Sequence, residues 1–313
     1  MTGRFAPSPT GDLHLGNLRT AAIAWLSARA RNEPFLVRME DLDRQQSTHA
    51  AERGQLDDLA SIGLDWDVPV VRQSERFDLY HDAIADLRAR GAVYECYCTR
   101  REIRAEIAAA AQAPHGPPGA YPGTCRTLTA SQREQRRAAG RRPALRLRTD
   151  GQCISFADRV AGEVTGAVDD VVLRRNDGVP AYNLAVVVDD HDQGVTEVVR
   201  GDDLLSSTPR QLLLHDLLDL TPPSYAHVPL VVDGDGERLA KRRGMAVTLE
   251  ELARTGVGLD EVVSWILSTL NAPSGSASLA ELVDGFDVSH LPVVPCPMPG
   301  FASGSSDERP PGG

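Results

Sequence analysis

Residues 4–17 read RFAPSPTGDLHLGN and form the most distinctive stretch of the chain. A short apolar pattern ends at two prolines, a glycine-containing turn follows, and a helical pattern begins just after His14. Free amides and the dipole at a helix start attract phosphate, and His14 can donate a hydrogen bond to phosphate oxygens. Gly16 leaves room for a nucleotide close to the backbone. The stretch predicts a phosphate site, although a simple turn capped by histidine would explain His14 and Gly16 alone.

Strand and helix patterns alternate on both sides of a central interruption. Alternation of this kind predicts an α/β protein with a parallel sheet covered by helices on both faces. The apolar spacing predicts helices at 14–31, 48–63, 75–90, 182–190 and from Pro209, with Thr208 as its cap residue, and strands at 3–9, 34–37, 170–175, 196–200 and 228–232.

The interruption spans residues 92–168 and holds three cysteines, a Pro/Gly-rich stretch at 114–123, a basic run and strand patterns at 144–149 and 153–157. We interpret it as an inserted subdomain that binds zinc and the acceptor. The sequence therefore predicts a sheet domain in two halves, 1–91 and 169–245, separated by the insertion at 92–168. A small helical part at 246–292 follows, with capping boxes at Thr248/Glu251 and Ser278/Glu281. Residues 293–313 are predicted to be a disordered tail.

Composition limits the class of protein. The 313 residues are 42% hydrophobic and carry a formal charge of -11, so the whole molecule does not resemble a nonspecific binder of polyanions. The basic run at 132–148 is a local exception, which fits either an RNA contact or an ordinary solvated helix. No apolar run is long enough for a membrane span and no signal peptide is evident, so we expect a cytoplasmic monomer with no membrane partner.

Three of the five cysteines are close in sequence and predict a zinc site. Cys96, Cys98 and Cys125 supply three thiolates, and a structural Zn²⁺ site requires a fourth ligand. By spacing, His115 and Tyr121 both qualify, and imidazole is the commoner ligand. Buried cysteines without metal are the alternative. The remaining two are expected to be a small buried residue, Cys153, and a tail residue, Cys296.

The stretch at 4–17 resembles the ATP-binding motif of class I aminoacyl-tRNA synthetases, and its flanks resemble the glutamyl and glutaminyl branch. The resemblance implies a Rossmann-like catalytic domain with ATP bound by His14, Gly16, Asn17 and Lys241, of which His14 and Lys241 are catalytic. Asn17 replaces the usual second histidine. Further stretches that match this branch in order are 38–43, 182–191, 199–203, 207–211 and RLAKR at 238–242, where Lys241 is kept but Arg238, Ala240 and Arg242 depart from the usual Lys-Met-Ser-Lys-Ser.

The amino-acid pocket can be argued from charge, because glutamate carries two carboxylates and one ammonium group. Arginine binds two carboxylate oxygens with its planar fork, and Arg4 and Arg200 both lie at ends of strand patterns, where the pocket is expected to open. Glu40 is the candidate partner of the ammonium group. The resemblance implies the same residues and suggests that Arg200 selects glutamate over glutamine. Ser8 and Tyr182 add neutral hydrogen bonds, and Phe5, Ala6 and Pro7 complete the predicted pocket.

The short remainder of the chain indicates a subgroup. Only 69 residues follow Gly244, too few for the anticodon-binding region of a glutamyl-tRNA synthetase, so the sequence resembles the truncated glutamyl-Q tRNA(Asp) synthetases. The Cys/Tyr/Cys order agrees with this subgroup and favours Tyr121 as the fourth ligand. The resemblance implies activation of glutamate by ATP with Mg²⁺, without tRNA, and transfer to queuosine in the anticodon loop of tRNA(Asp).

Three alternatives stay open at this point. The chain can be a glutamyl-tRNA synthetase catalytic fragment that works with a separately encoded anticodon domain. It can activate glutamate for another acceptor, such as a carrier protein. It can also be a catalytically silent relative that binds RNA or a synthetase. Departures from the two ATP-site motifs are consistent with this alternative, and they occur at Asn17, Arg238, Ala240 and Arg242.

Overall fold

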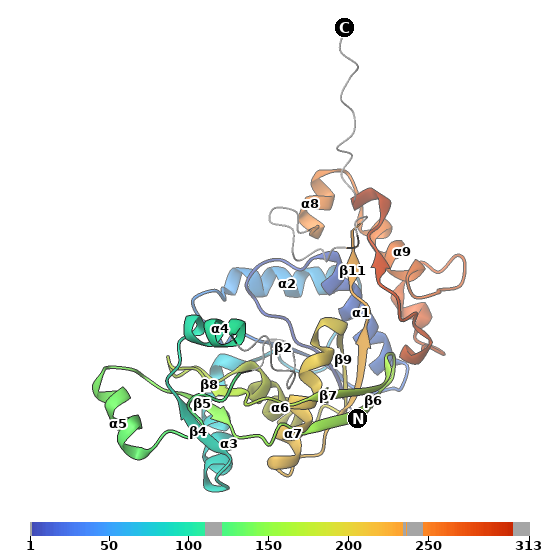
Figure 1. Cartoon of the computed structure of the whole chain (residues 1–313). Coiled ribbons are helices and arrows are strands. Elements are labelled where there is room, and N and C mark those ends of the chain that lie inside the picture. The colour runs from blue at the N-terminus through green and yellow to red at the C-terminus, as the bar shows by residue number, and fades with distance from the viewer. Residues whose placement is uncertain (1, 110–120, 234–235, 237–246, 303–313) are drawn as a thin grey trace.

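The computed structural model describes residues 2–109, 121–233, 236 and 247–302 (Figure 1). The first half of the parallel sheet follows the predicted alternation. Its strands pair in the order β1-β2-β3, all parallel. The elements are β1 (Gly3–Phe5), α1 (Leu15–Arg29), β2 (Phe35–Met39), α2 (His49–Ser61), β3 (Val71–Arg72) and α3 (Phe77–Ala89).

The second half adds β9 (Glu197–Gly201) and β10 (Ser224–Val228), which pair in parallel. The amides of Thr196 and Glu197 donate to the carbonyl of Thr2 at 3.0 and 3.4 Å, so β9 lies beside β1. The strand order reverses between β1 and β9, and ligands of doubly wound α/β folds bind at such a reversal. The helices of this half are α6 (Tyr182–Asp192) and α7 (Thr208–Leu217), the latter after a 3₁₀ turn at Asp202–Ser207.

The segment predicted as an insertion is joined to the sheets on both sides. An antiparallel sheet β4-β5-β8 includes β8, which lies beyond residue 168, and β6 pairs in parallel with β10. The expected boundary at 168 is therefore crossed by two sheets. The elements of this region are β4 (Val93–Cys96), α4 (Arg100–Ala109), α5 (Ala130–Ala138), β5 (Ala144–Leu147), β6 (Cys153–Asp158), β7 (Gly162–Ala167) and β8 (Val172–Arg174).

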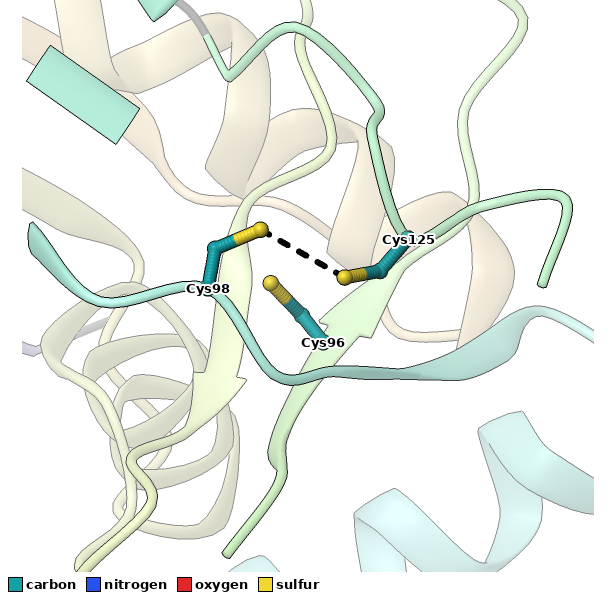
Figure 2. Close-up of side chains that lie close together, drawn as sticks. All are labelled: Cys96, Cys98 and Cys125. Atoms are coloured by element: carbon teal, nitrogen blue, oxygen red, sulfur yellow. Dashed lines mark hydrogen bonds between the residues drawn. The ribbon is translucent and has the colours of Figure 1, made fainter. Parts of the chain in front are cut away.

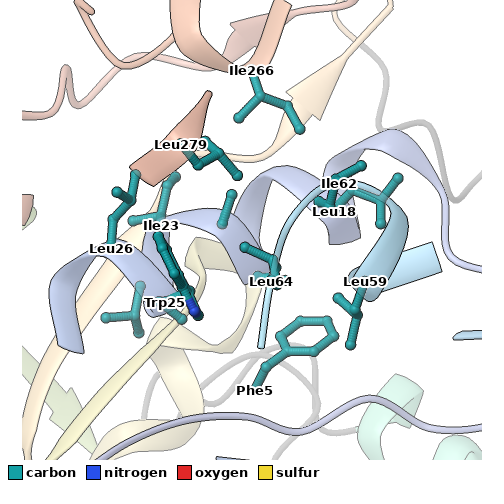
Figure 3. Packing of buried hydrophobic residues seen from close by; sticks show 14 of the residues in the cluster. Phe5, Leu18, Ile23, Trp25, Leu26, Leu59, Ile62, Leu64, Ile266 and Leu279 are labelled. Atoms are coloured by element: carbon teal, nitrogen blue, oxygen red, sulfur yellow. The ribbon is translucent and has the colours of Figure 1, made fainter. Parts of the chain in front are cut away.

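The C-terminal part packs on α1 rather than standing apart. Ile266 and Leu279 join Leu18, Ile23 and Leu26 in one buried cluster (Figure 3). A second core surrounds α6 and α7. The C-terminal elements are α8 (Leu249–Arg254), α9 (Leu259–Ser268), 3₁₀ turns at Leu279–Leu282, Val288–His290 and Gly300–Ala302, and β12 (Cys296–Pro297).

Disorder from residue 293 was a wrong prediction for 293–302. There β12 pairs in parallel with β11 (Val231–Val232), and Cys296 is buried rather than part of a loose tail. Cys153, expected to be buried, is exposed on the β6–β7 hairpin. Residues 303–313 lie outside the described residues.

Three local predictions also need correction. The strand expected at 228–232 is split into β10, which starts at Ser224, and the short β11. Thr208 is the first residue of α7, not its cap, and its hydroxyl bonds Arg200 instead. The Ser278 hydroxyl contacts the Glu281 carboxylate without capping a helix amide, whereas the capping box of Thr248 and Glu251 is confirmed. Among the described residues, no helix combines the length and the apolar character that crossing a bilayer requires.

Candidate active site

A cavity of about 670 Å³ lies at the reversal of strand order. Its walls are the carboxyl ends of β1 and β9 and the start of α1. The predicted residue Lys241, with Arg238, Ala240 and Arg242, lies outside the described residues. The cavity brings together all eleven other residues predicted for glutamate and ATP: Arg4, Phe5, Ala6, Pro7, Ser8, His14, Gly16, Asn17, Glu40, Tyr182 and Arg200.

His14 is the N-cap of α1. Its Nδ1 accepts hydrogen bonds from the amides of Gly16 at 3.1 Å and Asn17 at 3.3 Å, and Asn17 Oδ1 accepts from the His14 amide at 3.3 Å. Burial holds the pKa of His14 below its ordinary value, against an opposing effect of Asp203. A neutral ring that accepts at Nδ1 carries its proton at Nε2, so His14 is a hydrogen-bond donor through Nε2.

The amides at the start of α1 are used within the chain, contrary to our prediction that they are free for phosphate. His14 takes those of Gly16 and Asn17, and the Leu15 amide donates to the Val247 carbonyl at 3.0 Å. A phosphate at the N-terminal end of α1 can still be attracted by the helix dipole and by the Nε2–H of His14. Asn17 therefore completes the cap of the helix that carries His14.

Arg4 lies on the cavity wall with a carboxylate behind it. Its Nε lies 3.4 Å from Asp190 Oδ1, and its Nη1 donates to the Val199 carbonyl at 3.3 Å. Asp190 also pairs with Arg38, at 2.8 Å. Burial disfavours the charged form of Asp190, but Arg38 and Arg4 hold its pKa below the usual value.

Arg200 has a different environment, because its hydrogen-bond partners are neutral groups. Its Nε donates to His227 Nε2 at 3.0 Å, its Nη2 to Thr208 Oγ1 at 2.9 Å, and its Nη1 to the Tyr182 hydroxyl at 3.5 Å. The guanidinium also lies over the Tyr225 ring, 5.3 Å from its centre. Although Arg200 is buried, no ion pair among the described residues includes it, so it can bind an anion in the cavity.

Glu40 follows β2 and borders the same cavity. Burial raises its pKa to about 7, even though Arg38 and Arg4 favour the anion. The Glu40 carboxylate lies 3.8 Å from Arg38 Nη2. It can therefore be ionised near neutral pH and pair with an ammonium group.

Sequence reasoning missed the charged network beneath the cavity. Arg38 is fully buried between Asp189 and Asp190, and Asp189 also accepts hydrogen bonds from Gln73 and Tyr80, each at 2.8 Å. The sequence did indicate this charged network, since Arg38 interrupts the apolar run of β2 and the two aspartates end the apolar run of α6. Buried charges rarely occur without partners, so these positions were detectable as a set.

The predicted zinc ligands come together at the end of β4. The sulfurs of Cys96, Cys98 and Cys125 lie within 4.8 Å of one another (Figure 2). The Tyr121 hydroxyl lies 3.3 Å from the Cys96 sulfur and 3.5 Å from the Cys98 sulfur, and Cys98 and Cys125 are 3.4 Å apart. Donors around a tetrahedral Zn²⁺ with Zn–S bonds of about 2.3 Å are roughly 3.7 Å apart. The four groups thus fit such an ion, while His115 lies outside the described residues.

The basic run is only partly a helix. Along α5 and the loop after it, Arg137 pairs with Glu95 at 2.6 Å and Arg141 with Glu102 at 3.0 Å. Arg133, Arg136 and Arg142 make no ion pair with any residue the structure describes. No residue of α5 is buried, so this helix presents its charges to solvent.

Comparison with known proteins places the chain in a family. Residues 1–271 match the family described as tRNA synthetases class I (E and Q), catalytic domain. A protein of Nocardia farcinica named glutamyl-Q tRNA(Asp) synthetase is 57% identical over 94% of this chain and 91% of its own length. The chain belongs to the glutamyl-Q tRNA(Asp) synthetase family. The family resemblance and the Rossmann-like class I fold expected from the sequence are confirmed.

Other similar proteins agree with membership of the glutamyl-Q tRNA(Asp) synthetase family. The protein of that name from Symbiobacterium thermophilum is 46% identical over 96% of each chain. The glutamate–tRNA ligase 2 of Syntrophus aciditrophicus is 40% identical, and the match covers 91% of this chain but 61% of the ligase. The crystal structure of the glutamate-tRNA synthetase from Elizabethkingia anophelis superposes with a TM-score of 0.79 at 24% identity, covering 96% of this chain and 68% of that one, which shows the shared fold.

Proposed function

We propose that this chain activates glutamate with ATP and transfers it to queuosine in tRNA(Asp). The names of the relatives support this function. The observation that carries it is the cavity that holds two buried arginines, one carboxylate with a pKa near 7 and a helix start marked by His14. Those groups complement an amino acid with two carboxylates and one ammonium group, placed next to a triphosphate.

In the first step, an oxygen of the glutamate α-carboxylate forms a bond to the α-phosphorus of ATP. The bond from that phosphorus to the bridging oxygen breaks, and pyrophosphate leaves with the electron pair. Arg4, Arg200 and Glu40 hold the amino acid, and His14 donates from Nε2 to a phosphate oxygen. Lys241, outside the described residues, is the proposed cation for the leaving pyrophosphate, and Mg²⁺ accompanies ATP. Positioning and charge stabilisation suffice, since no protein nucleophile is needed.

In the second step, a hydroxyl group of queuosine attacks the carbonyl carbon of glutamyl-adenylate. An ester bond forms, the hydroxyl proton is released, and AMP leaves. We propose that the exposed arginines of 132–148 hold the RNA backbone during this step. Binding through such contacts weakens as salt is added, because counterions are released from the phosphates.

We propose further that Cys96, Cys98, Tyr121 and Cys125 hold Zn²⁺. None of the four lines the cavity at the reversal of strand order, which supports a structural role. The ion would join the end of β4 to the segment around Tyr121 and so order the region that precedes α5.

Two assays test the proposed function in sequence. Glutamate-dependent exchange between ATP and labelled pyrophosphate, measured without RNA, tests the first step, and no exchange would favour a silent RNA-binding relative. Transfer of radiolabelled glutamate is then compared on tRNA(Asp) with and without queuosine. We expect label only on the queuosine-containing tRNA, whereas label at the 3′ end of tRNA(Glu) would overturn the acceptor assignment.

A further inference from the structure

The guanidinium of Arg200 is connected to a carboxylate through an intervening imidazole. His227 Nε2 accepts from Arg200 Nε at 3.0 Å, and His227 Nδ1 lies 2.5 Å from Asp158 Oδ2. All three side chains are buried. Asp158 ends β6 and reaches this position because β6 pairs in parallel with β10, with Asp158 opposite Tyr225.

The proton positions in this chain of contacts follow from the donor groups. Arginine has no acceptor, so His227 Nε2 must accept from Arg200, and the ring proton must be on Nδ1, directed at Asp158. Burial lowers the pKa of His227, in keeping with a neutral ring, while Asp158 acts in the opposite direction. Asp158 is fixed in turn, since it accepts from the amides of Val160 at 3.0 Å and Ala161 at 2.9 Å.

The two arginines of the cavity therefore differ in how much of their charge is already compensated. Arg4 contacts the carboxylate of Asp190, whereas Arg200 contacts only neutral groups among its described hydrogen-bond partners. A neutral imidazole holds the orientation of Arg200 without cancelling its charge. The stacking of Tyr225 on His227, with ring centres 6.0 Å apart, keeps that imidazole in place.

We propose that His227 and Asp158 are positioning residues that fix Arg200 and keep its charge available to the side-chain carboxylate of the substrate. This inference rests on the proposed function and adds to it the origin of the preference for glutamate over glutamine. A carboxylate gains a charge-assisted pair with Arg200, which the amide of glutamine cannot form.

The first test is independent of activity. In protein labelled with ¹⁵N-histidine, NMR distinguishes protonated from unprotonated ring nitrogens, and His227→Gln identifies the signals of His227 by their loss. We expect a proton on Nδ1 and none on Nε2. A proton on Nε2, or a doubly protonated ring, would overturn the inference and leave the proposed function intact.

The second test uses Asp158→Asn and His227→Glu in ATP–pyrophosphate exchange. An asparagine that donates to Nδ1 moves the ring proton to Nε2, where it opposes the N–H of Arg200, and a carboxylate in place of the imidazole would compensate the charge of Arg200 directly. For both we expect the KM for glutamate to rise at least tenfold, the discrimination against glutamine to fall, and the KM for ATP to stay within twofold. His215→Gln, at an equally buried histidine of α7, is the matched control.

Thermal unfolding shows whether each variant is folded. If either Asp158→Asn or His227→Glu fails to fold, the KM for glutamate is judged from the other variant. An unchanged KM for glutamate in a folded variant would contradict the inference alone. Absence of glutamate-dependent exchange in the unaltered protein would overturn the proposed function and this inference together.

Discussion

A β-carbon on Gly16 would lie 3.0 Å from Cε1 and 3.1 Å from Nδ1 of His14. An alanine at this position would require the histidine ring that caps α1 to move by a few tenths of an ångström. The nearest other group, Val231, would be an ordinary contact at 3.6 Å. The two residues form one unit, in which the absence of a side chain on Gly16 allows the imidazole to lie over the first turn of the helix.

Gly16→Ala should displace the imidazole of His14 and weaken ATP binding. We expect the KM for ATP to rise on the order of tenfold, corresponding to about 1.4 kcal/mol, with a smaller change in the KM for glutamate. ATP–pyrophosphate exchange measures both constants. Gly54→Ala in α2 is the control, because a β-carbon there meets nothing closer than 3.7 Å. Equal effects of the two substitutions would refute the pairing of Gly16 with His14.

Glutamate binding should depend on the ionisation of Glu40. Burial raises the pKa of Glu40 to about 7, so below that pH the folded protein holds a proton where the ammonium group of the substrate requires an anion. We expect affinity for glutamate to fall about tenfold per pH unit below 7. Calorimetric titration between pH 5.5 and 8.5 measures this slope, and Glu40→Gln should abolish it together with most of the affinity.

The same pKa shift predicts how stability changes with pH. Between the ordinary value of 4.5 and about 7 the unfolded chain loses the Glu40 proton while the folded chain keeps it, so stability falls as pH rises through this window. The loss is at most about 3 kcal/mol. Glu40→Gln should remove this decline from urea unfolding curves, and Glu163→Gln, at an exposed carboxylate on β7, should not. A parallel decline in the Glu40 variant would rule out this residue as its source.

Tyr121→Phe tests the four-ligand zinc site. Loss of the hydroxyl removes the proposed fourth ligand atom, which lies 3.3 Å from the Cys96 sulfur, so we expect zinc affinity to fall at least tenfold. Elemental analysis after dialysis against graded chelator reports the metal retained per chain. Tyr97→Phe is the matched control, because the Tyr97 hydroxyl bonds Glu95 at 2.8 Å. Full retention of zinc by the Tyr121 variant would show that another group is the fourth zinc ligand.

Replacement of Arg133, Arg136 and Arg142 by glutamate should weaken binding of tRNA(Asp). These arginines have no ion-pair partner within the described part of the chain, so their charge is available to phosphate. We expect a loss of at least tenfold in 50 mM salt and a shallower dependence of the binding constant on salt. Filter binding measures both quantities, and Arg254→Glu on α8 is the control. Pyrophosphate exchange should be unaffected, and an unchanged salt dependence would argue for a merely solvated helix.

The cavity at the reversal of strand order was predictable from sequence because the residues that line it occur in short contiguous motifs. Arg4, Glu40 and Arg200 lie in or directly after strands, parallel strands bring their carboxyl ends to one edge, and Tyr182 reaches the same cavity from the start of α6. The cluster of Cys96, Cys98 and Cys125 was predictable because these cysteines are close in sequence, whereas spacing alone left both His115 and Tyr121 as candidates for a fourth ligand.

Residues that act through other residues were harder to find. His227 and Asp158 are 69 positions apart and meet only because β6 pairs with β10, a long-range pairing that periodicity does not reveal. The use of the α1 amides by His14 was missed because the sequence does not show which ring nitrogen faces the helix. The order of residues 293–302 was missed because a proline-rich composition hides a two-residue strand that depends on a distant partner.

The pairing of β12 with β11 bears on how shortened versions of the protein are prepared for crystallisation. Trimming the proline-rich end back to residue 293 would remove the hydrogen bonds from the Cys296 and Met298 amides to the carbonyls of Leu230 and Val232, at 2.9 and 2.8 Å. Leu230 and Val231 border the cavity, and Val231 lies near Gly16 at the start of α1. A cut placed after residue 302 preserves the pairing of β12 with β11 at the cavity wall, and a cut placed before β12 removes it.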